Sequence, residues 1–195
     1  MTLKRICVYC GSSNGINPAY KHAATQLGRA LHANGIGLIY GGAAVGIMGA
    51  VADAILEAGG QAIGVIPRAL AIKEVAHEHL TDLHVVESMH ERKALMAELS
   101  DGFIALPGGW GTLEELFEML TWAQLGFHQK PCGLLNIDGY YDGLIDFLET
   151  AFAQQFVKEV YRPILLSSDN PDDLLSLYAN YRAPDVPKWI NEEQL

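Results

Sequence analysis

The feature of this sequence that most constrains its fold is the alternation of short apolar segments with helix-like segments. Residues 103–106 form a continuous apolar run, which is typical of a strand covered on both faces. The segments predicted as strands are 5–10, 36–40, 62–66, 83–86, 103–106, 132–135 and 164–166. The segments predicted as helices are 18–34, 47–58, 89–99, 113–126, 143–154 and 172–181. This alternation predicts a Rossmann-like, doubly wound α/β fold, in which helices cover both faces of a parallel sheet.

The length and composition predict one compact domain. The chain has 195 residues, of which 50% are hydrophobic and 18% are charged. We expect the domain to span residues 1–182, with 183–195 as a surface or disordered tail. No apolar run is long enough to span a bilayer, and the first residues lead directly into a strand, so we expect a cytoplasmic protein and no membrane partner. A formal charge of −10 argues against a nucleic-acid surface, but a small anionic ligand is compatible with it.

Two short patterns suggest metal or redox chemistry and are predicted to carry neither. Cys7 and Cys10 have C-x-x-C spacing, but residues three apart in a strand point to opposite faces. The sequence His77-Glu78-His79 is expected in a solvated loop. We therefore predict no metal site.

Four loops are expected at the carboxyl ends of the strands, where ligands bind in such folds. They are residues 11–13, 41–46, 67–82 and 107–111. The loop at 41–46 is neither a P-loop nor a G-x-G-x-x-G fingerprint. Gly11 and Ser12 are candidates for hydrogen bonds to a phosphate or a ribose, although turns of this composition are common without any ligand.

The loop at 107–111 carries three glycines within four positions and leads into a predicted helix. Thr112 and Glu115 have the spacing of a capping box, so the helix is expected to begin at Leu113. A helix N-terminus at a strand end is suited to binding an anion.

Arg92 is a candidate binding residue on the helix predicted at 89–99. Helical spacing places it with Met89, Met96 and Leu99, which face the core. A buried guanidinium needs a partner, and a cation is disfavoured near a helix N-terminus, so a bound anion would relieve both costs. A buried carboxylate partner, or a side chain that reaches the surface, explains its position equally well.

Glu115 has two interpretations. It completes the capping box, or it lies partly desolvated at the edge of a pocket. Helical spacing places Glu115 with Met119 and Trp122, opposite the predicted core stripe of Leu113, Leu116, Phe117 and Leu120. This second apolar face predicts a homodimer, unless the loop after Gly126 or the C-terminal helix covers it.

The segment Pro107-Gly-Gly-Trp-Gly-Thr-Leu-Glu-Glu115 resembles the P-G-G-x-G-T-x-x-E signature of the LOG ("Lonely Guy") family. The resemblance extends through residues 89–93 and 121–126 and covers roughly residues 5 to 165. These proteins are cytokinin riboside 5′-monophosphate phosphoribohydrolases, and many bacterial members were labelled possible lysine decarboxylases. The segment 41–49 departs from the usual G-G-G-x-x-G-x-M-G pattern, because Ala43 replaces the third glycine.

The resemblance implies an enzyme that hydrolyses the N-glycosidic bond of an adenosine 5′-monophosphate, N6-substituted or plain, without a metal or cofactor. It implies that Arg92 and Glu115 are the catalytic pair. The substrate contacts expected at the strand-end loops and along the helix after them are Gly11, Ser12, Gly41, Gly42, Gly46, Glu74, Lys93, Gly108, Gly109, Trp110, Gly111, Thr112, Leu113, Glu114 and Thr121. The alternatives are a non-catalytic nucleotide or cofactor carrier, and a decarboxylase, for which no lysine lies at an interpretable site.

Overall fold

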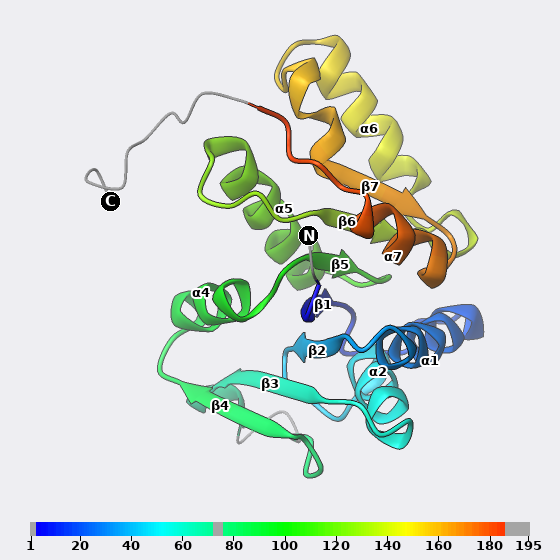
Figure 1. Ribbon diagram of the computed structural model, residues 1–195, viewed down its shortest axis with the longest axis vertical. Coiled ribbons are helices and arrows are strands. Elements are labelled where there is room, and N and C mark those ends of the chain that lie inside the picture. The colour runs from blue at the N-terminus through cyan, green and yellow to red at the C-terminus, as the bar shows by residue number, and fades with distance from the viewer. Residues whose placement is uncertain (1–2, 72–75, 186–195) are drawn as a thin grey trace.

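The computed structural model describes residues 3–71 and 76–185 and contains a seven-stranded parallel sheet of order β4-β3-β2-β1-β5-β6-β7 (Figure 1). The strands are β1 (Arg5–Tyr9), β2 (Gly37–Tyr40), β3 (Ala62–Pro67), β4 (Asp82–Val86), β5 (Phe103–Ala105), β6 (Cys132–Leu135) and β7 (Leu165–Ser168). The α-helices are α1 (Pro18–Ala33), α2 (Gly46–Glu57), α3 (Arg68–Ala71), α4 (Met89–Leu99), α5 (Trp110–Leu125), α6 (Asp142–Ala153) and α7 (Pro171–Ala179), and two 3-10 segments are η1 (Ile137–Gly139) and η2 (Glu159–Ile164). The predicted doubly wound α/β fold is confirmed.

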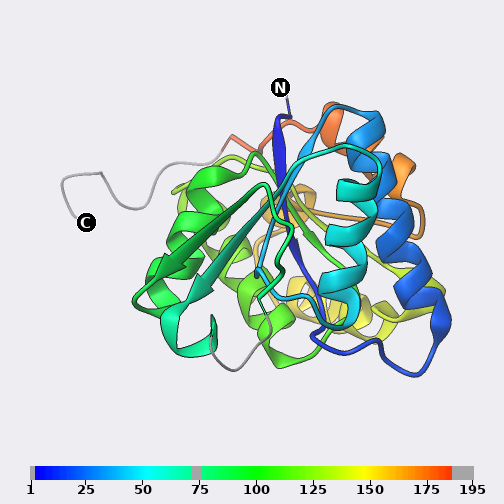
Figure 2. The ribbon, with the colours of Figure 1, turned by 90° about the horizontal axis from the view of Figure 1, so that it is seen from below.

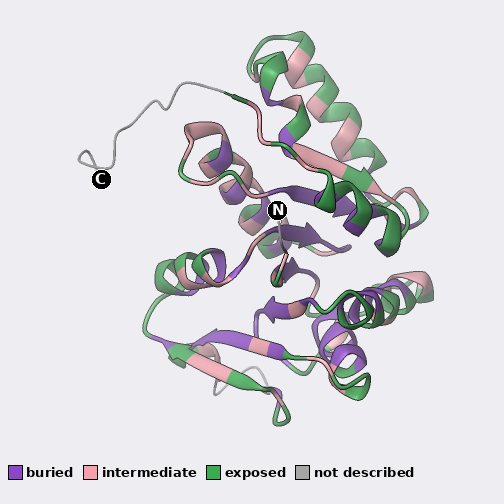
Figure 3. Cartoon of the chain, in the orientation of Figure 1, coloured by how far each residue is buried: buried purple, intermediate pink, exposed green. Residues whose placement is uncertain are grey.

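The helices cover both faces of the sheet. Helices α1, α2 and α7 lie on one face, and α4 and α5 lie on the other, where α6 sits beyond α5 near β7 (Figures 1 and 2). Alternate residues of β1 enter separate apolar clusters: Ile6 and Val8 pack with α1 and α2, whereas Cys7 and Tyr9 pack with α4 and α5. Burial is accordingly greatest in the central strands (Figure 3). Cys10 belongs to the first cluster, so the predicted divergence of Cys7 and Cys10 is confirmed.

The switch point of the sheet lies between β1 and β5. From β1 the chain adds β2, β3 and β4 outward in one direction and then returns to pair β5 with the other edge of β1. Tyr9 is in register with Ala105, so both strands end at the same level. The loops that follow therefore meet, and the Gly11 N–H donates a hydrogen bond of 3.2 Å to the Pro107 carbonyl. Ligands in open α/β sheets bind at such a point.

The predicted start of α5 is wrong. The helix begins at Trp110, its N-cap is Gly109, and no side chain caps it. Thr112 is therefore the third helical residue and is buried, so the predicted capping box with Glu115 does not form. A Cβ added at Gly109 would meet open space, so packing does not restrict which residue forms this N-cap.

The predicted orientation of α5 is also wrong. Its buried residues are Thr112, Leu116, Met119 and Ala123, and Met119 is fully buried. Apolar residues occupy adjacent faces of this helix, so the sequence allowed two rotations about its axis. Trp122 is half-buried against the core, and its ring meets Phe127, which follows Gly126, at 6.5 Å. The loop after Gly126 therefore contacts Trp122. This is the arrangement expected if the apolar face is covered within the chain and not by a second copy.

His77 was expected in a solvated loop and is instead buried. Its Nε2 lies 2.9 Å from Asp53 Oδ1, and its backbone N–H donates to the Gly42 carbonyl at 3.0 Å. His79 donates its backbone N–H to His77 Nδ1, which assigns the ring proton to Nε2. Within the described ranges no group of His, Cys, Asp and Glu is arranged to hold a metal ion.

Two further expectations concern the membrane and the tail. Of the helices in residues 3–71 and 76–185, none has the length and apolarity to cross a bilayer. Within the predicted tail, residues 183–185 have no regular structure, and Ala183 and Pro184 are half-buried. The rest of the tail, residues 186–195, lies outside the described residues.

His128 makes the stability of the fold pH-dependent. Burial lowers the pKa of His128 to about 4, against the hydrogen bond that Nε2 donates to the Met119 carbonyl at 3.0 Å. The unfolded chain takes up this proton below about pH 6.5, whereas the folded protein resists it until about pH 4. We therefore expect His128 to lower the free energy of unfolding as pH falls from 6.5 to 4, by on the order of 1–3 kcal/mol.

Urea unfolding from pH 7 to 4 measures this effect. His128→Gln should have a flatter profile than the wild type, whatever its stability at pH 7, and the exposed His22→Gln should match the wild-type profile. Equal slopes for the wild type and His128→Gln would contradict the prediction.

Candidate active site

The first two strand-end loops are packed tightly against each other. Gly46 has a φ of +62°, and a Cβ at this position would lie 2.4 Å from the carbonyl carbon of Ser12. Glycine is therefore required where α2 begins. Ala43 is buried and forms an antiparallel bridge with Ala76. It is not among the residues of positive φ, so alanine fits the position where the family pattern has a third glycine.

The loop at residues 107–111 presents the N-terminus of α5 at the switch point. A Cβ on Gly108 would lie 2.1 Å from Thr112 Oγ1, so this glycine lets the threonine side chain fold against the loop. The first helical bond runs from the Leu113 N–H to the Gly109 carbonyl at 3.2 Å. The N–H groups of residues 109–112 precede that bond and have no partner within the helix. The capping argument for this helix start was wrong, but its free N–H groups are compatible with the expected anion site, which stays a prediction.

Arg92 is buried, at 8% exposure, on the inner side of α4, as its helical position predicts. Its Nε donates to the Val65 carbonyl at 3.0 Å, and Nη2 donates to the Gly41 carbonyl at 3.2 Å. A Cβ on Gly41 would lie 2.2 Å from Nη2, so glycine at this position admits the guanidinium. Among the described residues its hydrogen-bond partners are the carbonyls of Val65 within β3 and of Gly41 after β2 and the sulfur of Met89, and none is a carboxylate. Its positive charge is therefore left available at the strand-end edge.

Glu115 is half-buried on α5, one turn before the core residue Met119. Burial raises the pKa of Glu115 to about 7, an effect that the positive charge of Arg92 opposes and the negative charge of Glu114 reinforces. A carboxyl group with a pKa near neutrality beside a buried cation is typical of an active site. The charges of Glu115 and Arg92, the pair that the family resemblance implied, are close enough to interact, although no ion pair joins the two side chains in the described part of the chain.

Lys93 is engaged in an ion pair that links α4 to α5. Its Nζ lies 2.5 Å from Glu114 Oε1 and 3.1 Å from Glu118 Oε1. Burial lowers the pKa of Lys93, but these two carboxylates outweigh the burial and raise it. Lys93 and Glu114, both predicted substrate contacts, are therefore bonded to each other in this structure.

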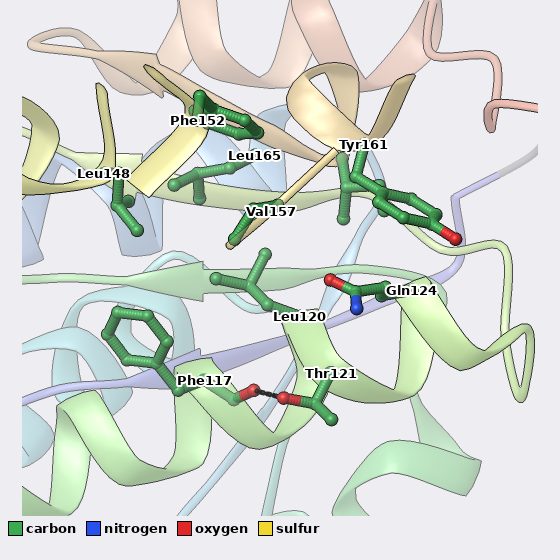
Figure 4. Close-up of a pocket in the computed structure, with 10 residues that line it drawn as sticks. Phe117, Leu120, Thr121, Gln124, Leu148, Phe152, Val157, Tyr161 and Leu165 are labelled. Atoms are coloured by element: carbon green, nitrogen blue, oxygen red, sulfur yellow. Dashed lines mark hydrogen bonds between the residues drawn. The ribbon is translucent and has the colours of Figure 1, made fainter. Parts of the chain in front are cut away.

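Other predicted contacts lie apart from this pair. Trp110 is 90% exposed, and Leu113 is half-buried at the edge of the core. Thr121 is six residues beyond Glu115, about 9 Å along the helix axis. Its hydroxyl donates to the Phe117 carbonyl at 2.7 Å, and it borders an apolar pocket between α5 and α6 (Figure 4). Glu74 lies outside the described residues.

A cavity of about 310 Å³ lies at the switch point, on the α1 and α2 side of the loops. Its lining residues are Gly11, Ser12, Ser13, Gly15, Tyr20, Ile47, Pro107, Gly108, Gly109 and Tyr140. Tyr20, Ile47 and Tyr140 were missed by the sequence analysis. Tyr140 follows β6, so the rule that ligands bind at strand ends would have found it if the sixth strand had been included.

A sequence model of the family described as "Possible lysine decarboxylase" matches residues 48–177. The cytokinin riboside 5′-monophosphate phosphoribohydrolase LOG7 of Arabidopsis thaliana is 49% identical over 178 residues, which are 91% of this chain and 82% of that protein. The corresponding LOG protein of Oryza sativa is 48% identical over 186 residues, which are 95% of this chain and 75% of that protein. The chain belongs to the LOG family. The signature at residues 107–115 thus spans the glycine loop after β5 and the first turns of α5 in this LOG protein.

Solved structures share the fold of this LOG protein at lower identity. A molybdenum cofactor binding protein from Rippkaea orientalis has a TM-score of 0.68 and 24% identity, covering 92% of this chain and 98% of its own. The molybdenum cofactor carrier protein of Chlamydomonas reinhardtii also has a TM-score of 0.68, with 20% identity, covering 91% of this chain and 96% of its own. At this identity the likeness establishes the fold alone.

Glu115 should reduce the stability of the protein above neutral pH. Its folded pKa of about 7 exceeds the ordinary value of 4.5, so the folded protein retains a proton that the unfolded chain releases between these values. The free energy of unfolding therefore falls as pH rises through this window. Glutamine resembles the neutral acid, so Glu115→Gln should be more stable than the wild type at pH 8, by on the order of 1–2 kcal/mol after allowance for solvent screening.

Urea unfolding at pH 4.5 and pH 8 tests this, with the exposed Glu57→Gln as the control. The advantage of Glu115→Gln should be smaller at pH 4.5 than at pH 8. An equal difference from the wild type at both pH values would show that the Glu115 carboxyl is not desolvated.

Proposed function

We propose that this LOG protein hydrolyses the N-glycosidic bond of an adenosine 5′-monophosphate, N6-substituted or plain, releasing the free base and ribose 5-phosphate. The observation that carries the proposal is a desolvated Glu115 whose charge interacts with that of the buried Arg92, on the helix whose N-terminus is uncapped. The relatives that are 49% and 48% identical are cytokinin riboside 5′-monophosphate phosphoribohydrolases, which supports the same reaction.

The proposed roles follow from the charge that develops during the reaction. Departure of the base leaves an oxocarbenium-like sugar, which an ionised Glu115 stabilises while it activates water on the opposite side of the ring. The Arg92 guanidinium favours the ionised form of Glu115 and offers a cation to the nucleotide. The N–H groups of residues 109–112 receive the phosphate. We retain Gly11, Ser12, Gly41, Gly42 and Gly46 as loop contacts of the substrate.

The 5′-phosphate should be essential for turnover. Adenosine lacks the anion that the α5 N-terminus and Arg92 are placed to bind, so we expect AMP to be cleaved at least about 100-fold more efficiently, as kcat/KM, than adenosine. N6-isopentenyl-AMP and its riboside should show the same ratio, and the comparison of the two nucleotides identifies the preferred base. Chromatographic detection of free base measures all four, and equal rates for nucleotide and nucleoside would refute the phosphate site.

Glu115→Gln is the matched control for the chemistry. It should still bind AMP but lose on the order of 100-fold in turnover, because an amide neither activates water nor balances positive charge. A wild-type protein that binds AMP without releasing base would instead support a non-catalytic nucleotide carrier.

We also propose that the protein is a homodimer. The face predicted from Met119 does not support this, because Met119 is buried in the core, but another surface does. An apolar pocket opens between α5 and α6 and is lined by Phe117, Leu120, Leu148 and Phe152, among others (Figure 4). Helix α6 has no buried residue, although Leu144 and Ile145 pack against the apolar cluster that contains α5. A second copy would cover this surface and bring a partner's residues beside Thr121, for which we propose a substrate contact across the interface.

A cytoplasmic location stays a prediction.

Leu148→Glu should separate the dimer, because it places a charge in the pocket, and the same change at Leu177, an exposed position on α7, should not. Sedimentation at micromolar concentration measures the mass of both variants and of the wild type. A monomeric wild type that retains activity would contradict the dimer.

A further inference from the structure

Three tyrosine hydroxyls donate hydrogen bonds to carbonyls of the segment that contains β5 and its following loop. Tyr178 donates to the Phe103 carbonyl at 2.5 Å, at the start of the strand. Tyr141 donates to the Leu106 carbonyl at 2.6 Å, just beyond the end of the strand. Tyr140 donates to the Gly108 carbonyl at 2.6 Å, within the glycine loop itself. The loop is therefore held by two consecutive tyrosines, and the strand by a third.

The Gly108 carbonyl belongs to the peptide whose N–H is that of Gly109. A peptide unit is planar and its C=O and N–H point in opposite directions, so a bond to one sets the direction of the other. The Gly109 N–H is one of the donors without a partner at the start of α5. Because neither Gly108 nor Gly109 carries a Cβ, the chain itself restricts this peptide little. The hydroxyl of Tyr140 supplies the restriction that the glycines lack.

Tyr140 is itself held firmly. Its ring meets Tyr20 edge-on at 5.4 Å and Tyr141 edge-on at 4.9 Å. The turn before it is tied to α1, because Asn17 Nδ2 donates to Asp138 Oδ2 at 2.8 Å. Asp138 has a φ of +51°, a conformation that a non-glycine residue adopts at a cost and that these contacts maintain. The Tyr140 hydroxyl that bonds to Gly108 therefore follows a turn that is fixed by its contacts with α1.

We propose that Tyr140 is a positioning residue that orients the Gly108–Gly109 peptide, and with it an N–H donor of the anion-binding end of α5. The inference rests on the proposed function, since it assigns the phosphate of the substrate to that end of the helix. Tyr140 acts through the peptide, because its hydroxyl is already bonded to Gly108.

The test compares Tyr140→Phe with Tyr178→Phe, which removes a similar hydroxyl bond from the other end of β5. Isothermal titration with ribose 5-phosphate and with inorganic phosphate measures affinity, and initial rates with AMP give KM and kcat. Tyr140→Phe should weaken both anions and raise KM by roughly 3- to 10-fold, the effect of losing one hydrogen bond, with a melting temperature close to the wild type. Tyr178→Phe should bind both anions normally but melt roughly 2–4 °C lower, because its hydroxyl is fully buried.

The NMR order parameter of the Gly109 amide in the protein without ligand separates positioning from direct contact. Tyr140→Phe should lower this order parameter, because the glycine loop then moves more freely, whereas a hydroxyl that only touched the ligand would leave it unchanged. An unchanged order parameter, or unchanged anion affinity in Tyr140→Phe, overturns the inference. If the wild type binds neither anion and releases no base from AMP, the proposed function fails. A lower order parameter in Tyr140→Phe with a normal one in Tyr178→Phe would then still support the role of the hydroxyl in ordering the loop.

Discussion

The parallel pairing of β1 with β5 is the constraint on which the rest of the structure depends. These strands are far apart in the sequence, yet Tyr9 and Ala105 are in register, so the loops after them start at one level. The bond from the Gly11 N–H to the Pro107 carbonyl joins those loops directly. Helix α5 then begins at the junction, where its free N–H groups face outward from the sheet edge. A shift of this register by one residue would move the two loops apart and break the hydrogen bond between them.

Burial of the charged groups of Arg92 and Glu115 destabilises the fold, and the two groups are stabilised to different degrees. Arg92 is buried without a carboxylate partner among the described residues, but the carbonyls of Val65 and Gly41 accept hydrogen bonds from it. The Glu115 carboxylate accepts no hydrogen bond from a described residue, and burial raises its pKa to about 7 despite the positive charge of Arg92. Lys93, by contrast, lies beside two carboxylates and is neutralised by them. The two cations of α4 thus differ in availability, and Arg92 is the one whose charge remains free to act on a ligand.

Much of this fold was predictable because strand and helix periodicities are local properties of the sequence. The strands were predicted within a few residues, and the inward direction of Arg92 follows from helical spacing alone. The start of α5 was not predictable, since the T-x-x-E pattern satisfies a capping rule that the packing of Thr112 against Gly108 overrides. The burial of Met119 was equally hidden, because apolar residues on two adjacent faces leave the rotation of a helix to the sheet.

The Lys93–Glu114 pair and the Tyr140 bond depend on the distance between elements, which a single sequence does not encode locally. That distance also explains how the site is divided. The cavity at the switch point opens toward α1 and α2, whereas Arg92 and Glu115 lie with α4 and α5 on the other side of the sheet. Gly108 allows close packing of Thr112, because a Cβ there would lie 2.1 Å from the threonine hydroxyl. Glycines also leave the backbone free to adopt many conformations, and the tyrosine hydroxyls that bond the carbonyls of Leu106 and Gly108 restrict that freedom.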